Sequence, residues 1–538
     1  MKIFKGIGAS EGAALAQILF LQEYDLTVVK TENCDKGIER RKIADALSAA
    51  EKEIDLLFAK AQKQDKQSAA VFEVHKMMLS DLDFTQGIDD ILEQGLNAEY
   101  AVRQTADSLK AMFASLDSEY MRERAADVED VAARVIRILK GIAEPEDTGD
   151  KKVIVLARDL LPSQTVKLDK EKVLGFVTQQ GGVTSHSVIL ARTMGIPCVV
   201  GMGEPFNNIP KEGMLAIDGK NGEVVYDPDE KTRAKYQSLI GAYGREKASL
   251  EDFRGKEAVT KSGHKVIVAA NIGSVADAQL ALDNDCGGVG LFRSEFVYLE
   301  SEDFPSEEKQ FEIYKAVLQK LAPRQVVIRT LDLGSDKQAP YFNISDEENP
   351  ALGYRAIRIC LKEQHIFTTQ LRALLRASAF GSLAVMFPMI THIEQVIKIK
   401  EIVKKTKAQL DKENLPYSKD VQWGIMVETP AAALLSDKLA PLVDFFSIGT
   451  NDLTQYTLAV DRTNGKIKDL FDSSNEAVLR FIEMTADNAR KNGIWVGICG
   501  ESAANTSLTD FYMKLKIDEL SVSPSSILKV KRAVTESE

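Results

Sequence analysis

One histidine lies in a segment suited to phosphate chemistry. His186 stands in residues 181–187, Gly-Gly-Val-Thr-Ser-His-Ser, where two glycines allow a tight turn and three hydroxyls surround the imidazole. An apolar segment at 173–177 precedes this stretch, and a helical pattern at 188–192 follows it. A histidine between a strand and a helix lies near helix N–H groups, which bind anions. The segment predicts a histidine that handles phosphate, and a structural histidine in a turn is the alternative.

A second set of polar residues lies at or near the ends of short apolar segments in the C-terminal half. These residues are Arg293, Arg329, Arg355 and Arg462, together with Glu428, Asn451, Asp452 and Cys499. Four arginines at one rim indicate an anion, because like charges repel and a guanidinium binds carboxylate or phosphate in a bidentate manner. Two carboxylates among them, with ligand oxygens and waters, are the usual way to hold Mg²⁺. The set predicts a small dianionic substrate, a magnesium ion and an arginine clamp.

Each member of this set has a plainer interpretation when it is taken alone. An arginine near the end of a strand is about as often a solvated surface group, and a cysteine is more often a small buried apolar residue. Glu428 is harder to explain this way, since an ionised carboxylate that closes an apolar strand needs a partner. The functional interpretation therefore depends on the residues as a group.

The elements that must position these residues follow from the apolar patterns. Eight short apolar segments recur after residue 260, separated by helical stretches, and predict a (β/α)₈ TIM barrel whose chemistry collects at the C-terminal ends of the strands. They lie near 266–270, 287–291, 325–329, 383–388, 422–427, 444–448, 494–498 and 519–523. The N-terminal half is α/β in character and is interrupted by long amphipathic periodicity. The predicted helices there are 38–57, 69–79, 98–116 and 120–139.

These patterns predict four regions. Residues 1–20 and 144–230 form an α/β domain that carries His186, and 21–143 form a helical domain inserted into it. Residues 231–259 are charged and helical, as expected of a linker helix. Residues 260–538 form the barrel.

Composition limits the class of protein. The 538 residues contain no run of 18 apolar residues, and the N-terminus lacks the apolar core of a signal peptide, so we expect no membrane insertion. The five cysteines are scattered without metal or disulfide spacing, which is typical of the reducing cytoplasm. The net charge is −12 and no basic tract is present, so a basic protein is a more plausible partner than nucleic acid. The few histidines show no pairing that would indicate a histidine-based metal site.

Long motifs in a fixed order make the sequence similar to enzyme I of the bacterial phosphoenolpyruvate:sugar phosphotransferase system. The motifs lie at 6–12, 181–186, 290–296, 329–332, 353–358, 426–433, 446–456 and 498–501. The resemblance covers nearly the whole chain. It implies an α/β multidomain protein, in which a swivelling phosphohistidine α/β domain with an inserted helical bundle is followed by a C-terminal TIM barrel.

The resemblance also implies a role for each matching residue. His186 is the phosphoryl acceptor, and Thr165 forms a hydrogen bond with its imidazole. The residues implied to hold phosphoenolpyruvate are Arg293, Arg329, Arg355, Arg462 and Asn451. Glu428 and Asp452 bind Mg²⁺, and Cys499 supplies the proton that converts enolpyruvate into pyruvate.

Partners follow from the same resemblance. The helical domain docks the histidine phosphocarrier protein HPr through segments matching 72–79 and 124–128, and the barrel forms a homodimer. A large hinge motion near 231–260 carries His186 between the barrel and HPr. The sequence departs from the family at Val183, where arginine is frequent, and at Ser335, where glycine is frequent. The segment 514–521 lacks the family's glycines, and family members commonly run some tens of residues further.

Three other classes of protein are alternatives to this interpretation. A pyruvate phosphate dikinase or phosphoenolpyruvate synthase requires an ATP-binding domain before the histidine domain, and residues 36–143 show no phosphate-binding glycine-rich loop. A nitrogen-type enzyme I would carry an additional N-terminal sensory domain. A signalling scaffold that binds phosphoenolpyruvate without turnover need not keep His186, Glu428, Asp452 and Cys499 together.

Overall fold

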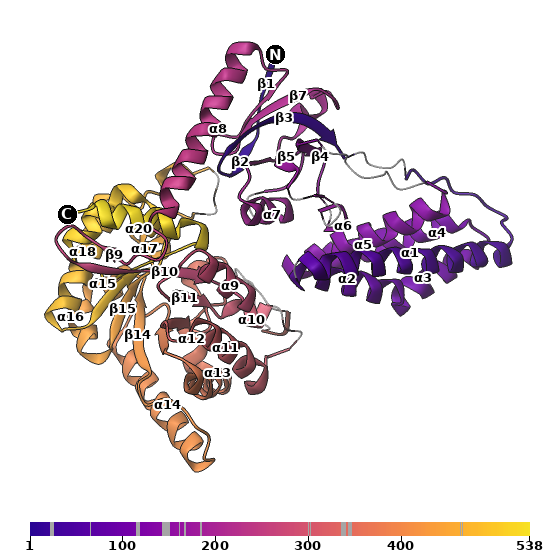
Figure 1. The fold of residues 1–538 in the computed structure, drawn as a ribbon. Helices are drawn as coiled ribbons and strands as arrows, with labels where there is room; N and C mark the ends of the chain where they lie inside the picture. Colours follow the sequence, from indigo (N-terminus) through magenta and orange to yellow (C-terminus); the bar gives the residue numbers. More distant parts are fainter. Residues whose placement is uncertain are drawn as a thin grey trace. The chain divides into compact units, whose positions relative to one another are not determined.

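The protein is described by a computed structural model. The described residues are 1–21, 26–64, 66–114, 119–142, 151–160, 162–165, 168–169, 171–182, 185–299, 301, 303–334, 340–342, 347–462, 464 and 466–538. The chain divides into two compact units, Met1–Ala248 and Ser249–Glu538 (Figure 1). Among the described residues, no helix is both long and apolar enough to cross a membrane.

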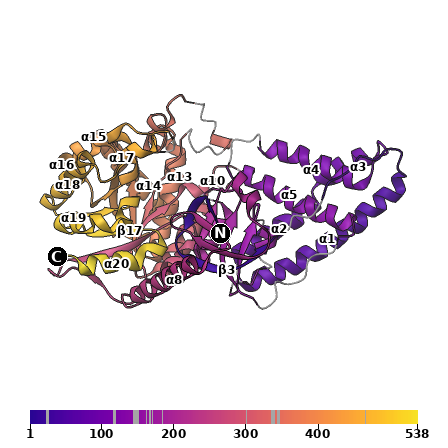
Figure 2. The same ribbon diagram turned by 90° about the horizontal axis from the view of Figure 1, so that it is seen from above.

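Five helices of the first unit lie side by side as a bundle (Figure 2). They are α1 (Lys36–Gln64), α2 (Lys66–Leu79), α3 (Leu82–Leu92), α4 (Ala98–Ala114) and α5 (Glu119–Leu139). Their apolar faces share one core, with members such as Ile54, Phe72 and Val135. The sequence pattern missed α3, although the N-cap Asp81, whose side chain accepts a hydrogen bond from the Asp83 N–H, could have indicated its start.

The first unit also contains an eight-stranded sheet with the order β1-β8-β7-β3-β4-β5-β6-β2. The strands are β1 (Lys2–Lys5), β2 (Ile7–Ser10), β3 (Ala13–Phe20), β4 (Val153–Ala157), β5 (Val173–Thr178), β6 (Cys198–Val200), β7 (Met214–Asp218) and β8 (Glu223–Tyr226). The β3, β4, β5 and β6 strands pair in parallel, and the other pairings are antiparallel. The helical bundle lies between β3 and β4 in the sequence. The sheet is therefore formed by strands that precede the bundle and strands that follow it.

Short helices follow the parallel strands. They are α6 (Pro162–Thr165), α7 (His186–Met194) and the 3₁₀ helix η1 (Glu204–Asn208). The long helix α8 (Glu230–Glu251) comes after the sheet, and its buried Tyr236 donates a hydrogen bond of 2.8 Å to the Glu223 carboxylate.

The second unit is a closed parallel barrel. Its strands are β10 (Lys265–Ile272), β11 (Val289–Arg293), β12 (Val326–Arg329), β13 (Leu383–Phe387), β14 (Gln422–Val427), β15 (Phe445–Ile448), β16 (Trp495–Ile498) and β17 (Glu519–Val522). Each strand pairs in parallel with the next, and β10 pairs with both β11 and β17, which closes the barrel. The short strand β9 (Ala258–Val259) adds antiparallel to β10. The predicted (β/α)₈ barrel is confirmed, and all eight predicted segments are its strands.

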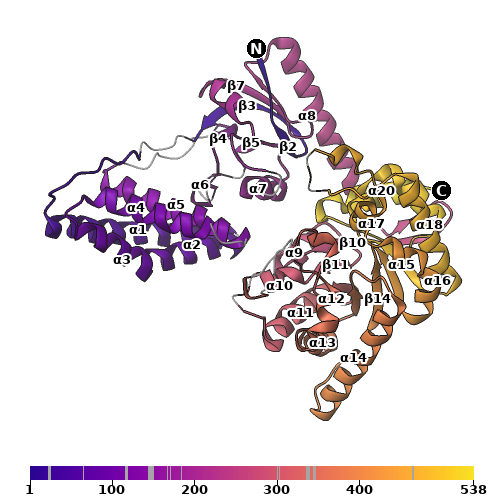
Figure 3. The same ribbon diagram turned by 180° about the vertical axis from the view of Figure 1, so that it is seen from behind.

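Helices surround these strands (Figures 1 and 3). They are α9 (Val275–Asp283), α10 (Glu295–Leu299), α11 (Glu307–Leu321), α12 (Ile357–Lys362), α13 (Gln364–Ala377), α14 (Ile393–Lys412), α15 (Pro430–Leu434), α16 (Ser436–Leu439), α17 (Thr450–Leu458), α18 (Glu476–Lys491), α19 (Thr509–Lys514) and α20 (Ile527–Glu536). The described part of the unit also contains eight 3₁₀ helices: η2 (Pro340–Phe342), η3 (Pro350–Leu352), η4 (Ser378–Phe380), η5 (Ala440–Leu442), η6 (Lys468–Leu470), η7 (Glu501–Ala504), η8 (Thr506–Leu508) and η9 (Pro524–Ser526).

The barrel has two apolar layers. The large layer lies between strands and helices, and a smaller cluster that includes Leu291, Met386 and Phe445 fills the inside of the barrel. Alternate strand residues belong to the two layers, as expected for parallel strands that are buried on both faces. The rigid double layer fixes the positions of the polar residues at the strand ends.

Candidate active site

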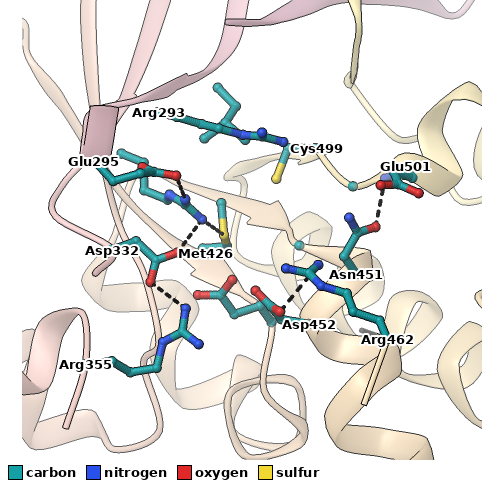
Figure 4. A pocket seen from close by; sticks show the side chains of 15 residues that line it. Arg293, Glu295, Asp332, Arg355, Met426, Asn451, Asp452, Arg462, Cys499 and Glu501 are labelled. Carbon is teal, nitrogen blue, oxygen red and sulfur yellow. Dashed lines mark hydrogen bonds and ion pairs between the residues drawn. The ribbon is translucent and has the colours of Figure 1, made fainter. Parts of the chain in front are cut away.

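A cavity of about 200 Å³ opens at the C-terminal ends of the barrel strands (Figure 4). Its lining contains all eight barrel residues that the sequence singled out: Arg293, Arg329, Arg355, Glu428, Asn451, Asp452, Arg462 and Cys499. They come from β11, β12 and α17 and from the segments that follow β12, β14, α17 and β16. The roles that the resemblance implies for them stay predictions.

Two carboxylates hold the buried arginines of the site. Arg329 donates to Glu295 at 2.6 Å through Nη2 and pairs with Asp332 at 2.8 Å through Nη1. Asp332 also pairs with Arg355 at 3.1 Å, so one carboxylate lies between two guanidinium groups. All four side chains are buried. Charge-assisted pairs of this kind fix the direction of an arginine fork before a ligand arrives.

Sequence reasoning assigned no role to Glu295 or Asp332, although both stand in motifs that it singled out. Their spacing could have identified them, since Glu295 lies two residues after Arg293 and Asp332 lies three residues after Arg329, and both arginines end a strand. Both carboxylates are almost completely buried, and such groups are rarely buried unless they are paired.

Glu428 directly follows β14 and is 1% exposed. Its Oε1 accepts a hydrogen bond of 2.6 Å from the Met389 N–H, and Met389 has a φ of 56°, which is uncommon for a residue with a side chain. Burial raises the pKa of the Glu428 carboxyl well above its ordinary value, and the nearby charges of Asp452 and Asp332 raise it further. A carboxyl group whose pKa is raised by neighbouring carboxylates marks a place where a cation would be stabilised.

Helix α17 presents Asn451 and Asp452 in its first turn. Asn451 Oδ1 accepts a hydrogen bond of 3.0 Å from the Glu501 N–H, and Asp452 Oδ1 lies 3.6 Å from Nη1 of Arg462. The helix ends at Leu458, and the next residue, Ala459, has a φ of 53°. The chain turns there, and Arg462 returns to line the cavity. The cavity is therefore lined by Asn451 and Asp452 from the start of the helix and by Arg462 from beyond its end, all three of which the sequence predicted.

Cys499 follows β16 and is buried, and its Sγ lies 3.6 Å from the Ile448 carbonyl oxygen. Burial raises the pKa of the thiol to about 12, so the group carries its proton at neutral pH. The guanidinium of Arg293 extends toward it in Figure 4. The arrangement places a protonated thiol beside a cavity that four arginines line.

The donor set of the cavity fits a divalent metal ion that binds oxygen. Among the described residues, no group of three or more histidine, cysteine, aspartate or glutamate side chains could hold a metal. Glu428 and Asp452 offer carboxylate oxygens, and their mutual repulsion raises the pKa of Glu428. Mg²⁺ is usually held by one or two carboxylates with substrate oxygens and water, so a pair of carboxylates is enough.

His186 belongs to the first unit and is the first residue of α7, after the N-cap Ser185. The strand β5 before His186 and the helix α7 that begins with it are both present, as the sequence predicted. Gly181 has a φ of 96°, a conformation that favours glycine, and the hydroxyls of Ser185 and Ser187 lie 2.9 Å apart. The His186 side chain lies outside the described residues, as do Val183 and Ser335. Thr165 is buried at the end of α6, and its hydrogen bond with the imidazole stays a prediction.

Fold and site together define a class of protein. The sequence matches three parts of the family of PEP-utilising enzymes: the N-terminal domain over residues 5–124, the mobile domain over 149–222 and the PEP-binding domain over 247–538. The match to the PEP-binding domain covers the barrel and every residue that lines its cavity.

Within this class, the chain belongs to the phosphoenolpyruvate-protein phosphotransferase family. It is 42% identical to the phosphoenolpyruvate-protein phosphotransferase of Listeria innocua serovar 6a, over 98% of this chain and 93% of that protein. It is also 42% identical to the protein of that name from Bacillus subtilis strain 168, over 99% of this chain and 94% of that protein. A solution structure of an Enzyme I protein covers 45% of this chain and 99% of its own, with 34% identity and a TM-score of 0.40.

Proposed function

We propose that the protein transfers the phosphoryl group of phosphoenolpyruvate to its own His186 and then to the phosphocarrier HPr, releasing pyruvate. This is the first step of sugar uptake by the phosphotransferase system. The observation that carries the proposal is the single cavity in which four arginines, Glu428, Asp452 and Cys499 meet. Similarity to phosphoenolpyruvate-protein phosphotransferases over nearly the whole chain supports it.

The arginines bind and orient the substrate. A phosphoryl group and a carboxylate are both anions that guanidinium forks recognise, and Arg329 and Arg355 are held in place by Glu295 and Asp332. Fixed cations of this kind stabilise charge on the phosphoryl oxygens during transfer without reorganising. Arg462 and Asn451 complete the binding set on the α17 side, and Arg293 lies on the Cys499 side.

Glu428 and Asp452 would hold Mg²⁺, which when bound supplies positive charge to the phosphoryl oxygens. Cys499 keeps a proton on sulfur, as required of a group that protonates the methylene carbon of enolpyruvate. His186 attacks the phosphorus as a neutral imidazole, and Thr165 orients its other nitrogen. In phosphoryl transfer, the protein contributes mainly by positioning the reacting groups and stabilising charge.

The remaining parts of the proposal concern partners. We expect the helical bundle to dock HPr through segments of α2 and α5 at 72–79 and 124–128, and the barrel to form a homodimer. Arg124, Ala125 and Ala126 have side chains outside the described residues. The negative net charge of −12 is suited to a basic partner.

The proposal is tested by intact-mass spectrometry of the protein after incubation with phosphoenolpyruvate and Mg²⁺, with fragmentation to locate the modification. We expect one acid-labile phosphoryl group on His186 that disappears when HPr is added, with one pyruvate released per phosphoryl group. The His186→Ala variant should gain no phosphoryl group while it still binds phosphoenolpyruvate. Binding by the wild type without phosphorylation would instead support a signalling scaffold.

A further inference from the structure

Gln370 of α13 is a fully buried amide on the apolar face of its helix. Its neighbours along the helix, Phe367, Leu371 and Leu374, belong to the large apolar layer of the barrel. The described residues that line the cavity do not include Gln370. Burying an amide among apolar side chains is unfavourable unless its polar atoms are hydrogen-bonded, so the partners of Gln370 indicate what the amide does.

Both polar atoms of the Gln370 amide are hydrogen-bonded. Its Oε1 accepts a hydrogen bond of 2.9 Å from the Leu331 N–H. Its Nε2 donates to the Ser294 hydroxyl at 3.0 Å and to the Tyr314 hydroxyl at 3.2 Å. A backbone N–H can only donate, so Leu331 determines which end of the amide carries the oxygen. All four side chains are fully buried, so these hydrogen bonds are shielded from water.

Two of these partners stand in the segments that carry charged residues to the cavity. Ser294 lies in the segment 293–295 at the end of β11, and Leu331 lies in the segment 329–332 at the end of β12. The cavity-lining residues of these two segments are Arg293, Glu295, Arg329 and Asp332. The amide of Gln370 therefore bridges two segments that are far from it in the sequence, by 76 residues for Ser294 and 39 for Leu331.

The bridge lies where the sheet no longer holds these segments together. The pairing of β11 with β12 ends at Arg293 and Arg329, so ladder hydrogen bonds fix the two strands only up to that point. Beyond it, the segments are joined by the ion pair of Arg329 with Glu295 and by the amide of Gln370. The ion pair lies at the cavity, where a bound anion would compete for the guanidinium, whereas the amide is buried away from it.

On the basis of the function proposed above, we infer that Gln370 is a positioning residue for phosphoenolpyruvate binding. Its amide holds the segments after β11 and β12 at the separation that lets Arg293 and Arg329 bind the same substrate molecule. An apolar side chain of equal size would fill the same space without fixing that separation. A fully bonded polar group in a buried environment specifies one arrangement of its partners, and here the partners are the two arginine-bearing segments.

The third partner of Gln370 belongs to a network that leads away from the cavity. The Tyr314 hydroxyl donates to Gln310 Oε1 at 3.1 Å, and Gln310 Nε2 donates to the Pro305 carbonyl oxygen at 2.9 Å. Removing the Tyr314 hydroxyl therefore breaks a buried polar network but leaves the hydrogen bonds of Gln370 to Ser294 and Leu331 in place. Tyr314→Phe thus provides a matched control for the loss of buried hydrogen bonds.

The test is steady-state kinetics of the full-length protein with phosphoenolpyruvate, Mg²⁺ and HPr. Gln370→Met preserves the length of the side chain but removes the amide. We expect its KM for phosphoenolpyruvate to rise by about tenfold or more, because small displacements of binding groups are costly. Its KM for HPr should stay within about twofold of wild type, since HPr binding involves other residues. A purely structural defect would instead lower the fraction of active protein, and hence kcat, without changing either KM.

Two further variants separate positioning from stability. Ser294→Ala removes the acceptor in the segment after β11, and its KM for phosphoenolpyruvate should rise by about threefold or more. Tyr314→Phe should melt at a lower temperature than wild type while its KM for phosphoenolpyruvate stays within about twofold. A wild-type KM in Gln370→Met, or an equal rise in Tyr314→Phe, would overturn the inference. If Gln370→Met does not fold, a wild-type KM in Ser294→Ala overturns it.

Failure of the proposed function would be seen separately in the wild type. A wild-type protein that binds phosphoenolpyruvate but leaves His186 unphosphorylated counts against that function alone. The dissociation constants of phosphoenolpyruvate, measured by calorimetry, would then replace KM and should follow the same order among the three variants. A wild-type protein that does not bind phosphoenolpyruvate would overturn both the function and the role of Gln370.

Discussion

At the scale of single residues, buried charges of the barrel fall into paired and unpaired groups. Arg329, Arg355, Glu295 and Asp332 neutralise one another, and burial of such charges is tolerated because they are paired. Glu428 and Glu519 form no ion pair within the described residues, and both have a raised pKa. Unpaired buried carboxyls reduce stability and therefore indicate sites where function outweighs folding.

Glu519 predicts a specific dependence of stability on pH. Its pKa is about 8 in the folded protein and about 4.3 when unfolded, so between these values only the folded state holds the proton. The free energy of unfolding must then fall as pH rises through this window. Replacing Glu519 with Gln removes the effect, and we expect a gain on the order of 2–5 kcal/mol at pH 8 that shrinks towards pH 5.

Urea denaturation of the full chain at pH 5 and pH 8 measures this prediction. The exposed Glu501 provides a matched control, since Glu501→Gln should leave stability unchanged at both pH values. A gain of the same size at pH 5 and pH 8 would show that Glu519 does not titrate as described.

The sequence predicted cavity residues better than it predicted their partners. Arginines, carboxylates and a cysteine at the ends of apolar segments can be recognised because a barrel brings all strand ends to one rim. The hydrogen bond from Met389 to Glu428 depends on a backbone conformation that no local pattern specifies. Glu519 resembles an ordinary charged residue at the start of a strand, and only the opposing glycines reveal its burial.

At the scale of elements, some helices and strands could be predicted from the sequence and others could not, and burial explains part of the difference. The eight barrel strands are covered on both faces, so they appear as continuous apolar runs and could be found from the sequence. Helix α3 has only three buried residues, Phe84, Ile88 and Leu92, and it was missed. With 11 residues, α3 is near the lower limit of length at which an apolar pattern separates a helix from a strand.

The contact between Gly500 and α17 predicts a local effect on the site. A side chain at Gly500 would collide with Thr450, the first residue of α17 and fully buried. Gly500→Ala should therefore displace the turn that carries Asn451 and Asp452. We expect phosphoenolpyruvate to bind at least about tenfold more weakly and stability to fall by about 1–3 kcal/mol.

Isothermal titration calorimetry with Mg²⁺ present and a thermal melt check this pair of effects. Gly244→Ala is the matched control, because a side chain at Gly244 in α8 meets nothing within 4 Å. It should leave binding unchanged and stabilise the protein slightly. Wild-type affinity in Gly500→Ala would mean that the start of α17 does not position the ligand.

At the scale of the whole molecule, the proposed reaction divides its groups between two compact units. His186 lies in Met1–Ala248, and every residue that lines the described cavity lies in Ser249–Glu538. Transfer to His186 therefore requires the two units to come together during turnover. Domain motions of this kind are part of the catalytic cycle in many enzymes. Under the proposed function, binding of phosphoenolpyruvate should need the second unit alone.

The last prediction follows from this division. A fragment of residues 247–538 retains all eight barrel strands, their closing pair β10–β11 and the helices around them. Because the cavity is built from this unit, we expect the fragment to bind phosphoenolpyruvate with Mg²⁺ within about threefold of the full chain, which corresponds to about 0.7 kcal/mol. It should release no pyruvate, since it lacks the phosphoryl acceptor. The same fragment carrying Arg329→Ala should lose binding, and circular dichroism would verify that both are folded. A folded fragment without affinity for phosphoenolpyruvate would show that the first unit contributes directly to the binding site.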